Sequence, residues 1–313
     1  MLKRLFCLTL CAAFTAGVSV QQVNALEDFA VSEDSISTAL FIDISETPAI
    51  ASDDSYPIET NEIIEEISLV PEGPSILVDN TFVEDANPTI FEQTTYVSLR
   101  SIVQTVRPDA NIIWNGDHVS VTADGLSITV YPNSLYIIAN GRYLYLPHGV
   151  RVVDGVTMLP IRTLAQALDA DVYWNSEDKN TYITSGTGAI ISGNEFYDED
   201  ALYWLSHIIH AESGNQPLVG KISVGNVILN RVESAIFPNT VYDVIFQKNQ
   251  FSPTRNGSIY REPNTESVIA AKLCLDGAEV LSNALWFNRA GMNCWASRNK
   301  SCVATIGAHS FYA

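Results

Sequence analysis

Basic residues are missing from a long stretch of this 313-residue chain. Between Leu26 and Leu99 there are 17 acidic residues and no Lys or Arg, and the whole chain has a formal net charge of −19. No cluster of positive charge is available to neutralise phosphates, which excludes nucleic acid as an expected partner. Residues 196–313 differ from the rest because they are almost neutral, with 10 acidic and 9 basic residues.

Long apolar runs are equally scarce. The one sustained run, Leu5 to Val18, follows Lys3 and Arg4 and precedes the small-x-small sequence Val23-Asn24-Ala25. A positive start, a short apolar core and such a cleavage sequence are typical of a secretory signal peptide. An uncleaved membrane anchor is the alternative, but the run is short and is interrupted by Thr and Gly. We expect residues 1–25 to be removed on export, which leaves no segment that spans a bilayer.

Cysteine is sparse, and two of the five residues, Cys7 and Cys11, belong to the predicted signal peptide. Export permits a disulfide between Cys294 and Cys302, which would close a short loop, although the sequence leaves their geometry open. Cys274 lies in the apolar run SVIAAKLCL and is expected to be a small buried residue.

Residues 26–75 lack any sustained hydrophobic period. They are acidic and contain Ser, Thr and Pro, with only short apolar patches. Such a segment cannot bury enough apolar surface to offset the entropy of ordering, and its like charges repel one another. We therefore predict a disordered spacer.

Residues 76–186 contain an internal repeat, in which YVSLRSIVQTV (96–106) matches MLPIRTLAQAL (158–168). Arg100 aligns with Arg162, and each half continues to a Trp-Asn pair, at Trp114 and at Trp174. In each half a short strand leads into a helix and is followed by strands of alternating apolar residues. A hairpin turn is expected at Asn140-Gly141. The pattern predicts a compact α+β unit, followed by a short Gly-containing linker over residues 187–195.

This repeat resembles the stalk module named after the copper amine oxidase N-terminal domain. The resemblance implies a non-catalytic spacer or wall-associated element of bacterial surface proteins. The name does not imply copper, since residues 76–186 offer only His118 and His148 and no Cys as ligands. A functional role for Arg100 and Arg162 is open, but we expect a structural role at a strand–helix junction.

Residues 196–313 are predicted to be rich in helices joined by long loops, and one glutamate interrupts their pattern. Glu212 follows Leu205, Ile208 and Ile209 at helical spacing, so a carboxylate turns toward an apolar face. Burial raises the pKa of a carboxyl and lets it donate a proton near neutral pH. The alternative is a structural glutamate, capped by backbone amides or paired with Arg231.

A helix break follows this glutamate. Gly214 is expected to end the helix in a left-handed conformation, and Pro217 suits the first turn of a second helix. Gly220 and Gly225 in that second helix would allow close approach of a neighbouring helix. The break places Glu212 at the edge of a core, facing a loop-lined cleft.

From about Leu202 to the last residue, the blocks AES, GNVILNRV, FPNTVYDVIF, QFSP, ALWFN and IGAHSFY occur in an order that resembles the SleB/CwlJ family of bacterial cell wall hydrolases. The resemblance implies a mainly helical, lysozyme-like catalytic domain of the lytic transglycosylase type over residues 196–313. It also implies an enzyme without cofactor that acts on the glycan strands of spore-cortex or vegetative peptidoglycan, outside the cytoplasmic membrane. We expect a monomer.

The resemblance assigns the role of catalytic acid to Glu212. Family members often carry a second Glu where Gln216 stands here, and this departure argues against a two-carboxylate mechanism. A lytic transglycosylase needs one carboxyl, which first protonates the oxygen between N-acetylmuramic acid and N-acetylglucosamine. It then accepts the proton of the muramic C6 hydroxyl as that oxygen attacks C1. The other acidic residues weighed for a hydrolytic reaction are expected to be solvated charges: Glu233, Asp243, Glu262 and Glu266.

Polar and aromatic residues of the later blocks are candidates for glycan contacts. They are Asn230, Arg231, Phe251, Ser252, Trp286, Phe287, Asn288 and His309. For Asn230 and Arg231, capping and pairing within the helix is an equal alternative. The aromatic residues, which we expect in loops, could instead belong to the core.

Two rival functions remain. His207, His210 and Glu212 form an H-x-x-H-x-E pattern that would suit a zinc-dependent N-acetylmuramoyl-L-alanine amidase, but the three side chains do not converge on one helix face. A catalytically inactive wall-binding protein is the second alternative. Product chemistry separates the three functions.

Overall fold

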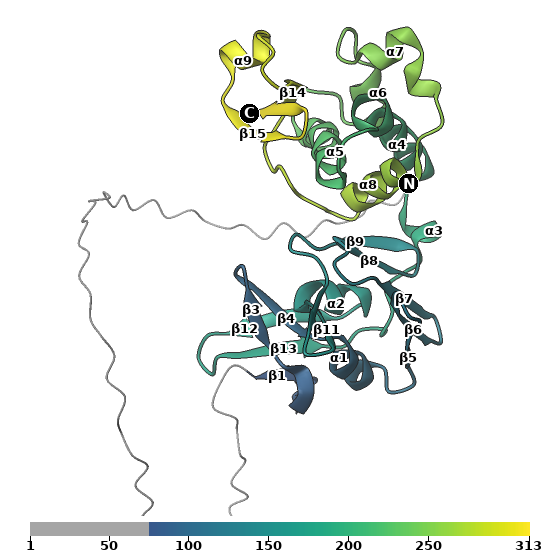
Figure 1. Cartoon of the computed structure of the whole chain (residues 1–313), viewed down its shortest axis with the longest axis vertical. Coiled ribbons are helices and arrows are strands. Elements are labelled where there is room, and N and C mark those ends of the chain that lie inside the picture. The colour runs from purple at the N-terminus through teal and green to yellow at the C-terminus, as the bar shows by residue number, and fades with distance from the viewer. Residues whose placement is uncertain (1–74) are drawn as a thin grey trace, which may run out of the picture. The chain divides into compact units, whose positions relative to one another are not determined.

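The computed structural model describes residues 75–313. The predicted signal peptide (1–25) and all but the last residue of the predicted spacer (26–75) lie outside the described residues. The described chain combines sheets and helices in the order shown in Figure 1, which confirms the predicted α+β class.

Three sheets and two short helices make up residues 76–190, called here the repeat region. The strand orders are β12-β13-β1-β2, β10-β11-β4-β3 and β5-β6-β7-β8-β9, and β1 pairs with β13 in parallel. The elements are β1 (Ile76–Val78), β2 (Thr81–Phe82), η1 (Glu84–Ala86), β3 (Thr89–Phe91), β4 (Thr94–Ser98), α1 (Leu99–Val106), β5 (Asn111–Trp114), β6 (Val119–Ala123), β7 (Leu126–Val130), β8 (Tyr136–Ala139), β9 (Arg142–Tyr145), β10 (Arg151–Val153), β11 (Val156–Pro160), α2 (Ile161–Ala167), β12 (Asp171–Asn175) and β13 (Asn180–Thr184).

The internal repeat appears in the structure as a local two-fold arrangement. Hairpin β3–β4 and hairpin β10–β11 share one sheet, because β4 and β11 pair antiparallel with Val97 opposite Leu159. Around that pair the register is symmetric, with Tyr96 opposite Pro160 and Ser98 opposite Met158. In the repeat, Tyr96 aligns with Met158 and Ser98 aligns with Pro160. Each half therefore contributes equivalent repeat positions to the junction.

Each half then continues into the predicted helix. Ser98 caps α1 by accepting a hydrogen bond from the Ser101 amide, whereas Pro160 takes the same place before α2 without a side-chain cap. The predicted turn at Asn140-Gly141 is confirmed, with both residues at positive φ between β8 and β9. The core of this region is almost wholly aliphatic and includes Val97, Ile102, Ile128, Leu159 and Leu164.

Helices dominate residues 193–313, called here the C-terminal region (Figure 1). Side chains of Asp198, Thr240 and Asn264 accept hydrogen bonds from the first turns of α4, α6 and α8 and so fix where these helices begin. The elements are α3 (Gly193–Phe196), α4 (Glu199–Ser213), α5 (Leu218–Glu233), α6 (Val241–Phe246), α7 (Ser252–Asn256), η2 (Ser258–Tyr260), α8 (Thr265–Leu275), β14 (Trp286–Arg289), α9 (Trp295–Asn299), β15 (Cys302–Ile306) and β16 (His309–Tyr312).

The loop predicted at residues 286–288 is wrong. Trp286, Phe287 and Asn288 do not lie in a loop but form β14, which pairs with β16 in a three-stranded sheet of order β14-β16-β15. The apolar residues of these short strands follow no strict alternation, so the sequence pattern gave no strand signal.

Close helix packing at Gly225 agrees with the prediction. A Cβ atom on Gly225 would lie 2.5 Å from Cys274 Sγ and 3.0 Å from Ile209 Cδ1, so this glycine lets α5 approach α8 and α4. Gly220 instead makes room for Gln216 and Ile306. Cys274 is buried, as expected.

The predicted linker, residues 187–195, is held against the repeat region. The Ile190 amide donates to the Ala167 carbonyl, and Asn140 Nδ2 donates to the Ile190 carbonyl. Farther on, Arg142 of β9 forms a buried ion pair with Asp276, which also accepts a hydrogen bond from the Tyr197 hydroxyl. The hairpin β8–β9 is thereby tied to the end of α8.

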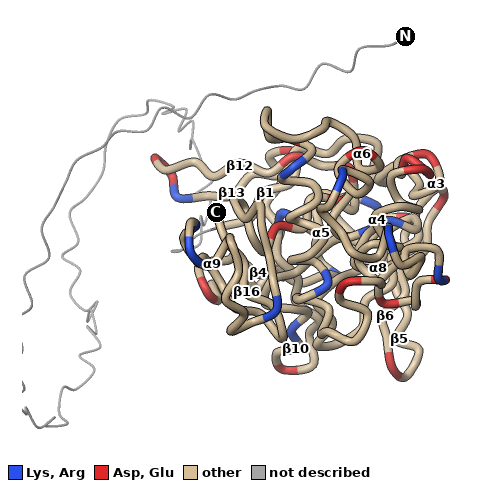
Figure 2. The backbone as a smooth tube through the Cα atoms, turned by 90° about the horizontal axis from the view of Figure 1, so that it is seen from above, with Lys and Arg blue, Asp and Glu red and all other residues tan. Residues whose placement is uncertain are grey.

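Charged side chains are scattered over the described backbone, and Figure 2 shows Lys and Arg interspersed with Asp and Glu. Within residues 75–313, no helix has the length and apolar character needed to cross a membrane.

Candidate functional site

Glu212 lies in the last turn of α4, where the sequence placed it. The apolar face that precedes it, Leu205, Ile208 and Ile209, is completely buried. Glu212 itself is partly buried, so its carboxyl is at the edge of this core. The predicted helix break follows directly, and α5 starts after Pro217.

The Glu212 carboxyl has no hydrogen-bond or ion-pair partner among residues 75–313. The alternative that it pairs with Arg231 is therefore wrong, since that guanidinium binds other groups. Burial raises the pKa of the Glu212 carboxyl. Its position acts in the same direction, because the C-terminal end of a helix is the negative end of the helix dipole and disfavours a carboxylate. Both effects favour a protonated acid.

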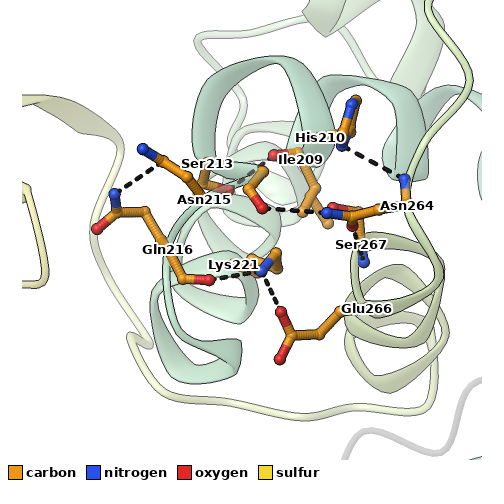
Figure 3. A network of polar contacts seen from close by, with 10 residues as sticks. Ile209, His210, Ser213, Asn215, Gln216, Lys221, Asn264, Glu266 and Ser267 are labelled. Atoms are coloured by element: carbon orange, nitrogen blue, oxygen red, sulfur yellow. Dashed lines mark hydrogen bonds and ion pairs between the residues drawn. The ribbon is translucent and has the colours of Figure 1, made fainter.

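The segment after Glu212 is held from three sides, and Figure 3 shows the contacts made by Lys221 and Asn264. Lys221 Nζ donates to the Gln216 carbonyl at 2.5 Å and forms an ion pair with Glu266 of α8. Asn264 Nδ2 donates to the Gly214 carbonyl at 3.1 Å. Gln216 Oε1 accepts the Ala308 amide at 2.8 Å. These contacts come from α5, α8 and the β15–β16 turn, and they fix the end of the helix that carries the acid.

Gly214 does not take the predicted left-handed conformation. Its φ of −55° and ψ of −25° are right-handed helical values. The glycine is needed because of crowding, since a Cβ atom there would lie 2.6 Å from the His210 carbonyl oxygen. Gly307 has a positive φ of 57° and faces the Gln216 side chain, so that turn also depends on glycine.

Asn230 and Arg231 serve the interior of the fold. Asn230 Nδ2 donates to the Leu281 and Ala284 carbonyls, and Arg231 Nε donates to the Leu285 carbonyl at 2.7 Å. Both residues thus hold the segment that enters β14. Arg231 is 4% exposed, and burial lowers its pKa to about 10, which leaves it charged at neutral pH.

Arg231 is also remote from the helix break. Leu218 and Arg231 are 13 positions apart in α5, a distance of about 20 Å along the helix. The structure therefore does not bring Asn230 and Arg231 next to Glu212.

Three other predicted residues form a continuous aromatic contact with Arg231. The guanidinium lies 5.2 Å from the Phe251 ring, which lies 6.3 Å from Phe287, whose ring in turn meets His309 at 5.4 Å. His309 follows Ala308, the residue bonded to Gln216. This row, called here the aromatic strip, leads from Arg231 toward the helix break.

Burial differs along the aromatic strip. Phe251 is 4% exposed and belongs to the core, whereas Phe287 and His309 are partly buried. Burial lowers the pKa of the His309 imidazole, and its Nδ1 atom is buried without a hydrogen-bond partner. A neutral imidazole with one free nitrogen can accept or donate a hydrogen bond to a ligand.

The remaining predicted contacts are dispersed. Ser252 is exposed at the start of α7, and Asn288 is paired with Ser310 in the sheet. Trp286 lies 5.8 Å from Trp295, and Lys300 Nζ lies 4.1 Å from the Trp286 ring centroid. Within residues 75–313, the side chains of Ser252, Asn288 and Trp286 make no hydrogen bond to the aromatic strip.

The two histidines near Glu212 are already engaged. His207 is buried, with Nδ1 2.7 Å from the Ile259 carbonyl oxygen, and the His210 Nδ1 atom accepts the Asn264 amide at 3.4 Å. Among residues 75–313, no group of three or more His, Cys, Asp or Glu side chains is placed to hold a metal ion.

The disulfide that the sequence leaves possible between Cys294 and Cys302 is not formed, and both thiols are free. Cys294 Sγ instead accepts the Ser297 amide and caps α9, while Cys302 Sγ contacts the Ala304 carbonyl in β15. Their nearness in sequence did not determine the direction of the side chains.

Sequence reasoning missed the residues that hold the helix break in place. Lys221 is 1% exposed, and it is paired with Glu266, which is exposed as predicted. A lysine inside the apolar run LVGKISVGNVIL was the available signal. Asn264 gave no such signal, because its contact with Gly214 joins residues 50 positions apart.

Comparisons with known proteins match both regions. Residues 215–312 match the cell wall hydrolase family, and residues 77–183 match the copper amine oxidase N-terminal domain. Glu212 lies three residues before the first of these matches.

Curated relatives include spore cortex-lytic enzymes. The enzyme from Bacillus cereus is 36% identical over 91 residues, which cover 29% of this chain and 35% of the relative. The enzyme from Oceanobacillus iheyensis is 30% identical over 128 residues, which cover 37% and 46%. This chain thus spans less than half the length of these relatives.

Solved structures that match include the catalytic domain of the germination-specific lytic transglycosylase SleB from Bacillus anthracis. It is 31% identical, with a TM-score of 0.35, and the match covers 37% of this chain and 97% of that chain. The catalytic domain of Bacillus cereus SleB gives 31% identity and a TM-score of 0.36, with coverage of 37% and 92%. The chain therefore carries a C-terminal domain of the cell wall hydrolase family, preceded by a copper amine oxidase N-terminal-like domain.

Proposed function

We propose that this protein is an exported enzyme that degrades peptidoglycan, cleaving the bond between N-acetylmuramic acid and N-acetylglucosamine as a lytic transglycosylase. The observation that supports this most is the Glu212 carboxyl, which is partly buried, has no partner among residues 75–313, and ends a helix directly before the segment that matches the cell wall hydrolase family. The names of the relatives, which describe lysis of spore cortex, agree with a peptidoglycan substrate.

In the proposed reaction Glu212 acts twice. The protonated carboxyl donates its proton to the glycosidic oxygen, and the C1–O bond of the muramic residue breaks. The carboxylate then accepts the proton of the C6 hydroxyl as that oxygen bonds to C1, which gives a 1,6-anhydro sugar and regenerates the acid. The raised pKa serves the first step, because a protonated carboxyl must be present at the working pH.

A single carboxyl suits this route. Gln216, four residues after Glu212, is an amide bound to the Ala308 amide and to Asn215, and it carries no charge that could activate water. No observation favours the amidase, since both histidines near Glu212 contact backbone groups.

The test is mass spectrometry of the muropeptides released from purified peptidoglycan. We expect 1,6-anhydromuramic ends. Free reducing ends would replace the proposal with a hydrolytic muramidase, and released stem peptides would replace it with an amidase. Binding without any release would indicate an inactive wall protein.

Glu212→Gln should lower the rate of product release by about 10²- to 10⁴-fold, because it removes the proton donor. Glu233→Gln is the matched control, since Glu233 is an exposed acid on α5 and should leave the rate unchanged. Near-parental release by Glu212→Gln would contradict the assigned role.

A further inference from the structure

Two cavities occupy equivalent places in the two halves of the repeat region. The first cleft, about 410 Å³, is lined by Arg100 and Trp114 together with Ser98 and Ser101. The second cleft, about 260 Å³, is lined by Arg162 and Trp174. The first volume lies near the lower end of the range for small-ligand sites, which is about 300–1,000 Å³, and the second lies just below it.

The local two-fold arrangement explains why the clefts match. β4 and β11 pair antiparallel, with Val97 opposite Leu159, so each hairpin extends toward the helix of the other repeat. The hairpin of one repeat therefore lines the cleft of the other. The first cleft is lined by Gly155, Val156 and Thr157, and the second by Gln93, Thr94 and Thr95, which are their counterparts in the repeat.

The two tryptophans also occupy the same place in their strands. Trp114 pairs with Val119 and Trp174 pairs with Thr181, and each partner lines the same cleft as its tryptophan. Trp114 is 54% exposed and Trp174 is 50% exposed. Large aromatic rings that are half exposed at the mouth of a cavity offer a flat apolar face to a ligand.

The expected structural role of the two arginines is not supported. Arg162 makes no hydrogen bond or ion pair within residues 75–313, and Arg100 makes one long contact, 3.5 Å, with the Ile112 carbonyl. Both side chains are exposed and lie in the first turn of a helix, where the helix dipole disfavours a cation. Folding does not account for a positive charge at both positions.

We propose that the two clefts are binding sites for peptidoglycan, with the tryptophan stacked on a sugar ring and the arginine bound to a carboxylate of the stem peptide attached to that ring. Planar guanidinium groups bind carboxylates through two parallel hydrogen bonds. Thr157 in the first cleft and its counterpart Thr95 in the second offer hydroxyls to the sugar hydroxyl groups. The choice of peptidoglycan over other carboxylated glycans rests on the function proposed above.

The charge of the region supports this ligand over a phosphate-rich wall polymer. Residues 100–195 carry 9 acidic and 6 basic residues, and residues 76–99 add only acidic ones. A phosphate-rich polyanion would be repelled by this surface, whereas the carboxylates of peptidoglycan lie on separate stem peptides, each of which needs only one local positive charge.

The test measures binding and not catalysis, so that its outcome is independent of the proposed reaction. The full chain carrying Glu212→Gln is sedimented with purified sacculi, either untreated or treated with hydrofluoric acid to remove phosphodiester-linked polymers. Trp114→Ala with Trp174→Ala should reduce the bound fraction at limiting protein by about 10²-fold, and each single change should reduce it less, because two sites on one domain act together.

The matched control is the double change Ile113→Ala and Tyr173→Ala. These residues precede the tryptophans, are similarly exposed at 46% and 52%, and face the opposite side of the same strands. The control should bind like the parent. Equal binding of the tryptophan variant and the parent, or equal loss in the control, would overturn the proposal. Binding that disappears after hydrofluoric acid treatment would assign the clefts to the phosphate-bearing polymer instead.

The arginines are tested with a second polymer. Arg100→Gln with Arg162→Gln should weaken binding to treated sacculi by about tenfold and leave binding to chitin, which has similar sugar rings without carboxylates, unchanged. Lys179→Gln, an exposed charge outside the clefts, is the control. Equal loss on both polymers would contradict the role of the carboxylate.

Discussion

The two regions of this protein differ in what they bury. The core of the repeat region is almost entirely aliphatic, and its buried charge, Arg142, is bound to Asp276 of the C-terminal region. The C-terminal region instead buries Lys221, Arg231 and His207, each bound to a backbone carbonyl.

This difference shows how each region uses its polar and charged side chains. Buried polar groups are costly unless they are satisfied, but when satisfied they fix one geometry. The C-terminal region uses Lys221 to hold the segment after Glu212 and Arg231 to hold the segment that enters β14. The repeat region keeps an apolar interior and presents Arg100 and Arg162, which form no ion pair within residues 75–313, at its surface.

Lys221→Met should give the largest loss of stability. It removes a buried ammonium and leaves the Gln216 carbonyl and Glu266 without their partner, so the free energy of unfolding should fall by about 2–3 kcal/mol. Arg162→Met in the repeat region should change it by less than about 0.5 kcal/mol, because that side chain has no partner to lose. Urea denaturation of both variants measures the two changes. Similar losses in the two variants would mean that the regions do not differ in this way.

Gly225→Ala should have a smaller effect, about 1–3 kcal/mol, because the new methyl group would crowd Cys274 Sγ and Ile209. The double variant Gly225→Ala with Cys274→Ala should be more stable than the sum of the single changes predicts, since the thiol that blocks the methyl is gone. Gly155→Ala in the repeat region meets no atom within 4 Å, but its φ of 80° is strained for alanine, so no second change should rescue it. Additive behaviour of the Gly225 pair would contradict the packing argument.

Glu212→Gln should change stability least and in the opposite direction. Because burial raises the pKa of this carboxyl, the folded protein holds the proton more tightly than the unfolded chain. The stabilisation is complete below the unfolded pKa and is lost as the pH rises through the raised folded value. The melting temperature of Glu212→Gln should therefore exceed that of the parent at pH 7 and approach it at pH 4. Glu233→Gln should show no such difference, and a parent that is more stable than Glu212→Gln at pH 7 would refute the assignment.

Local patterns in the sequence predicted much of the fold. The repeat revealed α1 and α2, the Asn140-Gly141 pair revealed a hairpin, and helical spacing placed Glu212 at the end of a buried face. Each of these features depends on residues that are close together in the chain. The role of Glu212 itself stays a prediction.

Contacts between distant segments were not predictable in the same way. The tie between Lys221 and Glu266 joins residues 45 positions apart, and strands β14 and β16 are too short and irregular to show a period. Arg231 lies far from Glu212 because it is near the far end of α5, and this became clear only from the observed length of that helix. The possible disulfide between Cys294 and Cys302 is not formed for a related reason: their spacing in the sequence does not determine the direction of their side chains.

The local two-fold axis at Val97 and Leu159 has a consequence for polarity. A glycan strand has a reducing and a non-reducing end, and a two-fold rotation reverses any direction perpendicular to its axis. Glycan strands that lie across this axis and bind alike in the two clefts would therefore run antiparallel, so the repeat region would bind two neighbouring strands and not one straight strand twice. Binding of this kind would set the orientation of the protein relative to the glycan strands of the wall, in addition to attaching it.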